Sequence, residues 1–265
     1  MRLAPRDYDD LRRAVRLLEK KRFIARLTHY AGRPVEQMLT ALPRGMSENI
    51  QRVVRTTVAR LLDMALKTMG GRVRPEASLR FHKLAGGLSG AAGGAFGLSA
   101  LALELPLSTA LMLRSIADIA RSEGEDLSSV ESRLACLEVF ALGGPGTGDD
   151  AADTGYYAVR ASLAKALSEA AHYIARKGLS EKGAPVMVRF ITQIASRFGA
   201  LVSEKAAAQA VPVIGAAGGA GINLLFMQHF QETARGHFIV RRLEKIYGQE
   251  AVRAAYQDLS RHREV

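Results

Sequence analysis

The chain has 265 residues, enough to bury a large core without covalent cross-links, and its single cysteine, Cys136, excludes an internal disulfide framework. Tryptophan is absent and aromatic residues make up 6% of a chain rich in alanine, leucine and arginine, a composition that favours helices over strands. The formal net charge is +11, and residues 1–83 alone hold 19 Lys and Arg against 8 Asp and Glu, so the whole excess lies in the N-terminal part.

A basic N-terminal part next to a neutral remainder is typical of a protein with a surface that binds phospholipid headgroups, nucleic acid or an acidic protein. The alternative is that the charges only solvate helices that are rich in arginine. The opening MRLAPRDYDDLRR lacks the apolar segment of a secretory signal, so we expect a cytoplasmic protein.

The N-terminal region reads as two helices. Residues 7–31 have an apolar stripe that includes Leu11, Val15 and Leu18, and they predict one amphipathic basic helix, which could lie in a headgroup layer or pack on the rest of the protein. Its candidate membrane-surface residues are Arg12, Arg13, Arg16, Lys20, Lys21, Arg22 and Arg26. A second helix is predicted from Ser47, as its N-cap, to Met69.

Residues 84–103 carry no charge, and glycines recur in them at four-residue intervals. A helix predicted to start at Pro75 enters this stretch, and its glycines would let another backbone approach closely. Pro106 is expected to start a new helix or to kink the old one, and the helix 106–122 follows.

The middle of the chain predicts ordinary amphipathic helices. Ser128 and Glu131 suggest a capping box, and further helices are expected over 153–177, ending at Gly178, and over 185–198. The loop 143–150 is rich in glycine, but it lacks the Lys-Ser/Thr pair of a nucleotide-binding loop.

A second uncharged stretch covers residues 206–228, and its GAAGGA at 215–220 repeats the GAAGGA at 90–95. We interpret the two as a possible internal pseudo-repeat. A long helix follows to a stop at Gly248, and a short helix runs to about Leu259. The predicted fold is all-α, a multi-helix bundle in which two glycine-rich helices pack closely in the core. We divide it into a basic N-terminal region, 1–83, and a helical core, 84–265, which form one continuous domain.

Polar side chains embedded in these apolar helices are the candidate ligand-binding residues, because a buried charge without a partner is costly. They are Glu104, Thr109, Arg114, Asp118, Asn223, His229, Glu232, Arg235 and His237. A pair between Arg114 and Asp118 within one helix is the alternative. The Glu and His spacing resembles that of metal sites in helix bundles, but no second such set occurs, so we expect no metal ion and no cofactor.

Two blocks, 87–144 (GLSGAAGGAFGLSALALELPLSTALMLRS and onward) and 211–248 (VPVIGAAGGAGINLLFMQHFQETARG and onward), resemble the EcsC family of bacteria, named after the third gene of an operon that encodes an ABC transporter. The resemblance implies an all-helical protein that has no established catalytic role and is sometimes associated with membranes. It also suggests association with an ABC transporter, and it supplies no catalytic residues.

We therefore expect a cytoplasmic protein, peripheral to the inner face of the cell membrane, that binds a lipid or another apolar ligand and is not an enzyme. One alternative is a hydrolase or metal-dependent enzyme that uses His229 or His237 with Glu104 or Glu232. Another is an integral membrane protein spanned by 84–103 and 206–228. Nucleic-acid binding would use the positive charge, but no recognition motif accompanies it.

Overall fold

The computed structural model describes residues 3–19, 23–32, 35–40, 44–69, 97–143, 155–178, 184–209 and 215–262. These residues form ten helices and no strand, which confirms the all-α prediction. The helices are α1 (Pro5–Leu18), α2 (Phe23–Ala31), α3 (Val35–Thr40), α4 (Arg44–Thr68), α6 (Gly97–Ser122), α7 (Val130–Leu142), α8 (Tyr156–Lys177), α9 (Pro185–Gln209), α10 (Gly215–Tyr247) and α11 (Gln249–Arg261).

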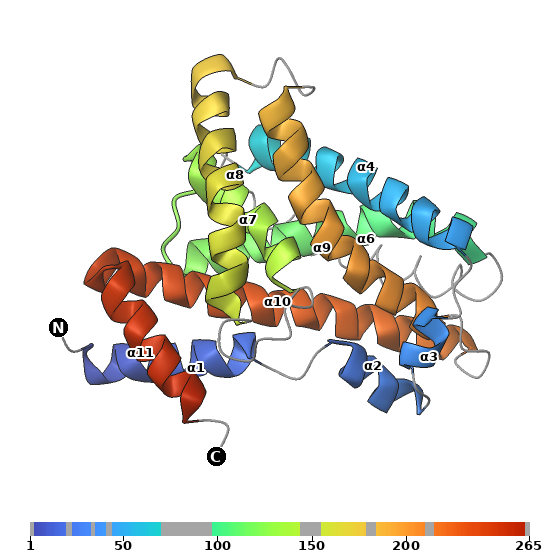
Figure 1. The fold of residues 1–265 in the computed structure, drawn as a ribbon, viewed down its shortest axis with the longest axis horizontal. Coiled ribbons are helices and arrows are strands. Elements are labelled where there is room, and N and C mark those ends of the chain that lie inside the picture. Colours follow the sequence, from blue (N-terminus) through green and yellow to red (C-terminus); the bar gives the residue numbers. More distant parts are fainter. Residues whose placement is uncertain are drawn as a thin grey trace.

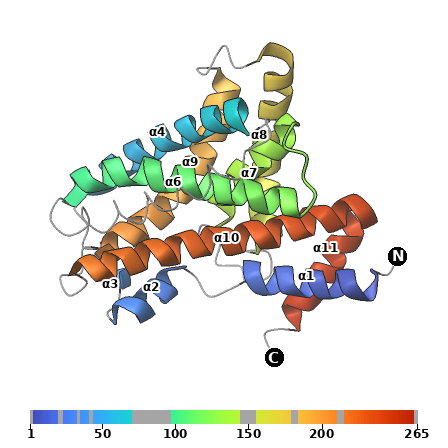
Figure 2. The ribbon, with the colours of Figure 1, turned by 180° about the vertical axis from the view of Figure 1, so that it is seen from behind.

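The long helix α10 runs through the molecule, and most of the other helices pack along it (Figure 1). The helices α1 and α2 follow one side of α10, and α6 follows the other (Figure 2). The helices α6 and α10 run in the same direction, since Gln231 donates to Ser115 Oγ at 2.9 Å and Arg242 pairs with Glu123 at 3.1 Å. The helix α10, whose first turns contain the second glycine-rich segment, thus lies against α6.

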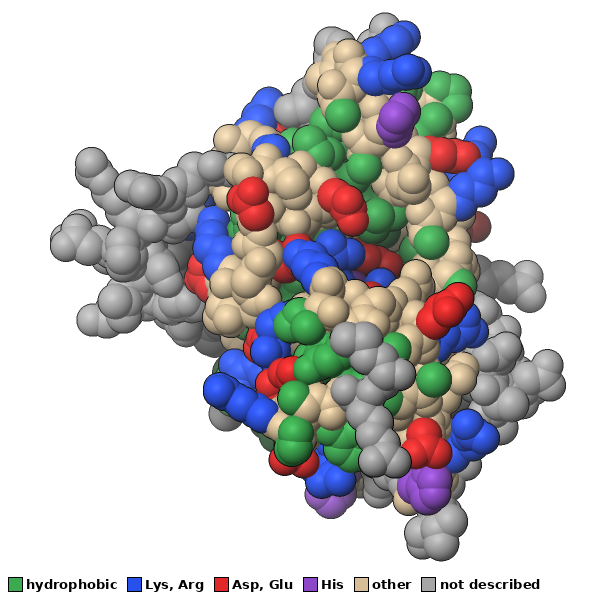
Figure 3. Space-filling view, turned by 90° about the vertical axis from the view of Figure 1, so that its left-hand side faces the viewer, with side chains coloured by type: hydrophobic (Ala, Val, Ile, Leu, Met, Phe, Trp, Pro, Cys, Tyr) green, Lys and Arg blue, Asp and Glu red, His purple; other side chains and the backbone are tan. Residues whose placement is uncertain are grey.

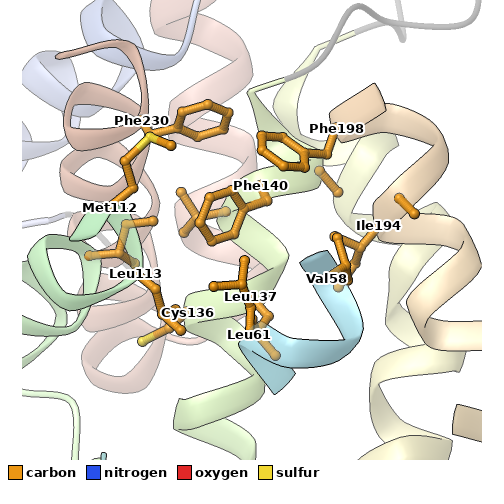
Figure 4. Close-up of a cluster of buried hydrophobic side chains, with 14 of the residues drawn as sticks. Val58, Leu61, Met112, Leu113, Cys136, Leu137, Phe140, Ile194, Phe198 and Phe230 are labelled. Atoms are coloured by element: carbon orange, nitrogen blue, oxygen red, sulfur yellow. The ribbon is translucent and has the colours of Figure 1, made fainter. Parts of the chain in front are cut away.

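The main hydrophobic core contains side chains of α4, α6, α7, α8, α9 and α10, and α2 and α3 add a few more (Figure 4). At its centre Phe140, Phe198 and Phe230 meet pairwise with ring centroids 5.1 to 5.6 Å apart. Such tilted and edge-to-face contacts are favourable for aromatic rings.

A second hydrophobic cluster lies under α1. It joins Leu11, Ala14 and Val15 of α1 to the C-terminal half of α10, to α11, and to Tyr156 and Tyr157 at the start of α8. The apolar face of α1 is therefore buried against protein.

The single helix predicted for residues 7–31 is wrong, because α1 ends at Leu18 and α2 begins at Phe23. At the end of α1 the Glu19 carboxylate accepts hydrogen bonds from the Tyr256 hydroxyl at 2.7 Å and from the Tyr156 N–H at 3.4 Å. Two shorter helices can each bury an apolar face, α1 in the second cluster and α2 in the main core. Lys20, Lys21 and Arg22 fall outside the described residues.

Two predicted helix caps are also wrong. The helix α4 begins at Arg44, so Ser47 lies in its first turn and is not the N-cap. The N-cap of α7 is Ser129, whose hydroxyl accepts from the Ser132 N–H, whereas the hydroxyl of Ser128 donates to Asp126 at 2.7 Å. The carboxylate of Asp126 thus binds the nearer serine, and the cap falls to the next one.

The helix α6 passes through Pro106, so no new helix starts there. The Thr109 hydroxyl donates a hydrogen bond to the Leu105 carbonyl at 2.6 Å within this helix. The helix α9 continues beyond the predicted end at 198 to Gln209, because its buried face extends through the alanines. The predicted stops at Gly178 and Gly248 are confirmed; both have positive φ, which favours glycine.

The predicted helix from Pro75, the glycine-rich segment up to residue 96 and nearly all of the loop 143–150 fall outside the described residues. The described N-terminal helices pack on the later ones, α1 on α10 and α4 on α9. The division at residue 83 stays a prediction.

Candidate functional site

The candidate residues of α6 have different surroundings. Glu104 accepts a hydrogen bond from the Lys205 ammonium of α9 at 2.7 Å. Thr109 is buried and its hydroxyl bonds its own helix, while Arg114 and Asp118 are exposed. Asp118 pairs with Arg121 at 3.0 Å, one turn further along α6.

The candidate residues of α10 also contact different parts of the molecule. His229 Nε2 donates to the Gly143 carbonyl at 2.8 Å, and Glu232 pairs with Arg26 of α2 at 3.1 Å. Arg235 is exposed and His237 is fully buried. The Oδ1 atom of Asn223 is buried and has no hydrogen-bond partner among the described residues.

These contacts bring Glu104 close to Lys205 and place His229 and Glu232 beside α2, apart from His237. That all nine residues serve one ligand stays a prediction. The hydrolase hypothesis, which pairs His229 or His237 with Glu104 or Glu232, stays a hypothesis.

Lys205 is a site residue that the sequence analysis missed. It is 0% exposed, with its ammonium 2.7 Å from the Glu104 carboxylate and 5.0 Å from the centroid of the Phe226 ring. Burial lowers the pKa of Lys205, and the neighbouring Glu104 carboxylate opposes that shift. A signal did exist: Glu104 is the first charge after the uncharged stretch 84–103, and Lys205 is the last charge before the stretch 206–228.

Exposed apolar side chains surround this end of the α6–α10 pair. Leu107 is 39% exposed, Leu224 is 67% exposed and Tyr30 of α2 is 45% exposed. The Ser115–Gln231 contact places Leu107 level with residue 223, and the Tyr30 ring lies over Gly221. The three side chains therefore come from adjacent helices at one level of α10. We call them the apolar rim.

The membrane-surface candidates of α1 lie on its outer side. Arg12, Arg13 and Arg16 are exposed, and Arg12 pairs with Asp9 and stacks on Tyr8. Arg26 is partly buried in its pair with Glu232. Of the seven candidates, Arg13 and Arg16 are thus exposed on α1, and they form no hydrogen bond or ion pair with the part of the chain that the structure describes.

A second polar cluster, also missed, surrounds His237. Its Nδ1 atom shares a hydrogen bond of 2.9 Å with the Tyr156 hydroxyl, and its Nε2 atom lies 3.7 Å from a Glu138 carboxylate oxygen. Burial lowers the pKa of His237. Burial also raises the pKa of Glu138 to about 7, and the positive charges of Arg160 and Arg241 reduce this second shift. His237 is therefore neutral near pH 7, whereas Glu138 titrates there.

Ion pairs border this cluster. Arg160 forms two hydrogen bonds with Glu244, at 2.8 and 2.9 Å, and Arg241 pairs with Glu125 at 2.9 Å. Burial opposes the ionisation of Glu125, but hydrogen bonds from Arg241 and Ser132 outweigh it and lower its pKa to about 2. On this side of the molecule, basic and acidic side chains gather in a hollow near the centre (Figure 3). Because these charges are paired with one another, the cluster is explained as part of the packing of α7, α8 and α10.

Within the described ranges, no three His, Cys, Asp or Glu side chains are grouped as they would be to hold a metal ion. Over the same residues, every helix is too short or too polar to cross a bilayer.

The family model of the EcsC protein family matches residues 16–243. The match extends from the last turn of α1 to near the end of α10 and includes Glu104, Lys205 and Asn223. No curated protein and no solved structure matches the chain.

Proposed function

Since the chain belongs to the EcsC protein family, we propose that it is a peripheral membrane protein that attaches to an anionic lipid surface on the cytoplasmic side of the cell membrane. The observation that carries the proposal is the row of exposed arginines on α1: Arg6, Arg12, Arg13 and Arg16. The family resemblance also suggests a membrane partner, an ABC transporter, which stays a prediction.

The packing of α1 leaves only its basic side for a partner. Leu11, Ala14 and Val15 are buried against α10 and α11, so the apolar face of α1 has no access to acyl chains in this conformation. The attachment that α1 supports is therefore electrostatic. Each basic residue near an anionic leaflet contributes about 1 kcal/mol, so four of them together give appreciable binding.

The basic edge of α1 borders the exposed stripe of α10. At 100° per residue, Arg6, Asp10 and Arg13 lie within about 60° of one another around α1. Asp10 pairs with Arg242 of α10 at 2.7 Å, so this edge faces α10. The exposed Arg235 lies on α10 close to this edge, because a Cβ at Gly236 would meet Leu18 of α1. Exposed cations of two helices thus lie near the contact between α1 and α10.

Vesicle flotation tests the proposal. The full-length protein is expected to float with phosphatidylglycerol vesicles at low salt and not to bind phosphatidylcholine vesicles. Rising salt should release it, because exposed charges are screened within about 10 Å at 0.1 M salt. Changing Arg13→Gln together with Arg16→Gln is expected to weaken binding at least tenfold, since two contributions of about 1 kcal/mol are lost.

The matched control removes the same charge elsewhere. Lys165 and Arg176 are exposed on α8, which extends away from α1 in Figure 1, and Lys165→Gln with Arg176→Gln is expected to bind as the wild type does. If both double variants lose binding equally, the attachment reflects net charge alone and α1 is not the contact. Flotation that does not depend on salt would also overturn the proposal.

A further inference from the structure

We propose that Lys205 and Asn223, beneath the apolar rim, form a binding site for the headgroup of an acidic lipid, that is, an oxyanion carried on an apolar chain. The inference rests on the proposed membrane attachment and names the ligand class that the protein takes from the membrane.

The Lys205 ammonium has hydrogen-bonding capacity that the described residues do not use. It carries three N–H donors, and one of them reaches Glu104. Its other close neighbour is the face of Phe226, which attracts the charge but accepts no conventional hydrogen bond. A fully buried ammonium needs more acceptors than this to offset its desolvation, and a phosphate or carboxylate group provides them.

Asn223 supplies the complementary group at the same level. It lies three residues before Phe226 on α10, and the Ser115–Gln231 and Glu123–Arg242 contacts place Glu104 level with residues 220–223. Its buried Oδ1 atom accepts no hydrogen bond from the described residues. An oxyanion that accepts from Lys205 and a hydroxyl that donates to Asn223 would satisfy both, as in a phosphatidylglycerol headgroup.

The apolar rim explains why the ligand would be a lipid and not a free ion. Leu107 follows Glu104 by one turn of α6. Leu224 lies exposed on the neighbouring α10, and Tyr30 lies exposed on α2, on the other side of α10. A group of large exposed apolar side chains marks a surface that acyl chains or another apolar surface can cover. Arg114 and Arg235 are exposed further along α6 and α10, so the rim is followed by cations suited to neighbouring acidic headgroups.

Glu104 acts as the counter-ion of Lys205. Its side chain is 20% exposed, so it lies between the buried ammonium and solvent. A ligand oxyanion must displace it or tolerate its charge. Two substitutions are therefore expected to change affinity in opposite directions: Lys205→Met weakens binding, and Glu104→Gln strengthens it.

The test measures calorimetric binding of ligands below their micelle concentration to the full-length protein. The ligands are short-chain phosphatidylglycerol, a medium-chain fatty acid, short-chain phosphatidylcholine and inorganic phosphate. We expect binding of one or both acidic lipids and not of the last two. The first two distinguish a phosphodiester from a carboxylate headgroup, and inorganic phosphate tests whether the oxyanion alone suffices.

The expected effects are a tenfold or greater loss for Lys205→Met, a loss for Asn223→Leu and a gain for Glu104→Gln, with circular dichroism to verify folding. Asn223→Leu serves in place of Lys205→Met if the latter fails to fold. The Arg13→Gln, Arg16→Gln variant is expected to bind the monomeric lipids normally, since it changes only the electrostatic surface.

The inference is overturned if the wild type binds neither acidic lipid in monomeric form, if inorganic phosphate binds as tightly as they do, or if the folded Lys205 and Asn223 variants bind like the wild type. Vesicle flotation that persists in such a case leaves the proposed function standing. Loss of salt-dependent flotation with intact binding of monomeric lipid would instead refute the proposed attachment and leave the site.

Discussion

At the scale of single residues, Glu138 contributes a pH dependence near neutral pH to the His237 cluster. Its pKa is raised by burial from 4.5 to about 7, so the folded protein holds this proton more tightly than the unfolded chain does. The free energy of unfolding therefore loses a contribution as pH rises from about 4.5 to about 7. Glu138→Gln removes this titration. At pH 8 we expect the variant to be more stable than the wild type by on the order of 1 to 3 kcal/mol.

Urea denaturation at pH 5, 6.5 and 8 measures this difference, which should shrink towards pH 5. The exposed Glu250→Gln on α11 is the control, and its stability should parallel the wild type at all three pH values. A constant offset between Glu138→Gln and the wild type would mean that the carboxyl group is not protonated in the folded protein near neutral pH.

The same scale shows where sequence reasoning stops. Glu104 and Asn223 were predicted as ligand residues because they interrupt apolar helices, which is a local property. Lys205, Tyr156 and Glu138 were missed, because each acquires its role from a partner on another helix: Glu104 lies 101 residues from Lys205, and Tyr156 lies 81 residues from His237. Periodicity within one helix contains no information about such pairings.

At the scale of helices, periodicity and glycine stops predicted which segments are helical, whereas tertiary contacts decided where several of them begin or end. The break after Leu18 follows from two separate burial sites for α1 and α2, and the cap at Ser129 follows from the binding of Ser128 by Asp126. The helix predicted from Pro75 into the glycine-rich segment lies, up to residue 96, outside the described part of the chain.

The close contact of α1 with α10 depends on Gly236. A Cβ at this position would lie 2.6 Å from Leu18 Cγ and 3.2 Å from the Ala14 carbonyl oxygen, which belongs to the backbone of α1. Gly236→Ala must therefore displace α1. Overpacking of this kind costs typically about 1 to 3 kcal/mol, and the gain in helix propensity of about 1 kcal/mol offsets only part of it. Urea denaturation should show a net loss of stability, and limited proteolysis should cut α1 faster.

Gly199→Ala is the matched control for that prediction. It also lies inside a helix, α9, but the atoms nearest to its added Cβ, at 2.5 to 2.9 Å, are the amide end of the exposed Gln51 side chain. That side chain can rotate away, so we expect unchanged or slightly higher stability. If both alanine variants behave alike, the approach of α1 to α10 is not limited by Gly236.

At the scale of the whole molecule, the two hydrophobic clusters predict two levels of stability. The main core contains buried side chains of eight of the described helices, whereas the second cluster holds α1 and α11 to the end of α10 with fewer buried side chains. Regions with less buried apolar contact open at lower free energy than the global unfolding. Backbone amides of α1 and α11 should therefore exchange hydrogen through a smaller opening than those of α7, with a weaker dependence on denaturant, as measured by native-state exchange and mass spectrometry.

Tyr256→Phe makes the prediction specific. It removes the 2.7 Å hydrogen bond from the Tyr256 hydroxyl to Glu19, a bond that connects α11 to the end of α1. The loss should lower the opening free energy of α1 and α11 by about 1 kcal/mol or more and leave the exchange of α7 unchanged, because α7 lies in the other cluster. Equal opening free energies and equal denaturant slopes for α1, α11 and α7 would instead mean that the two clusters unfold as one cooperative unit, and α1 would then be a permanent part of the bundle.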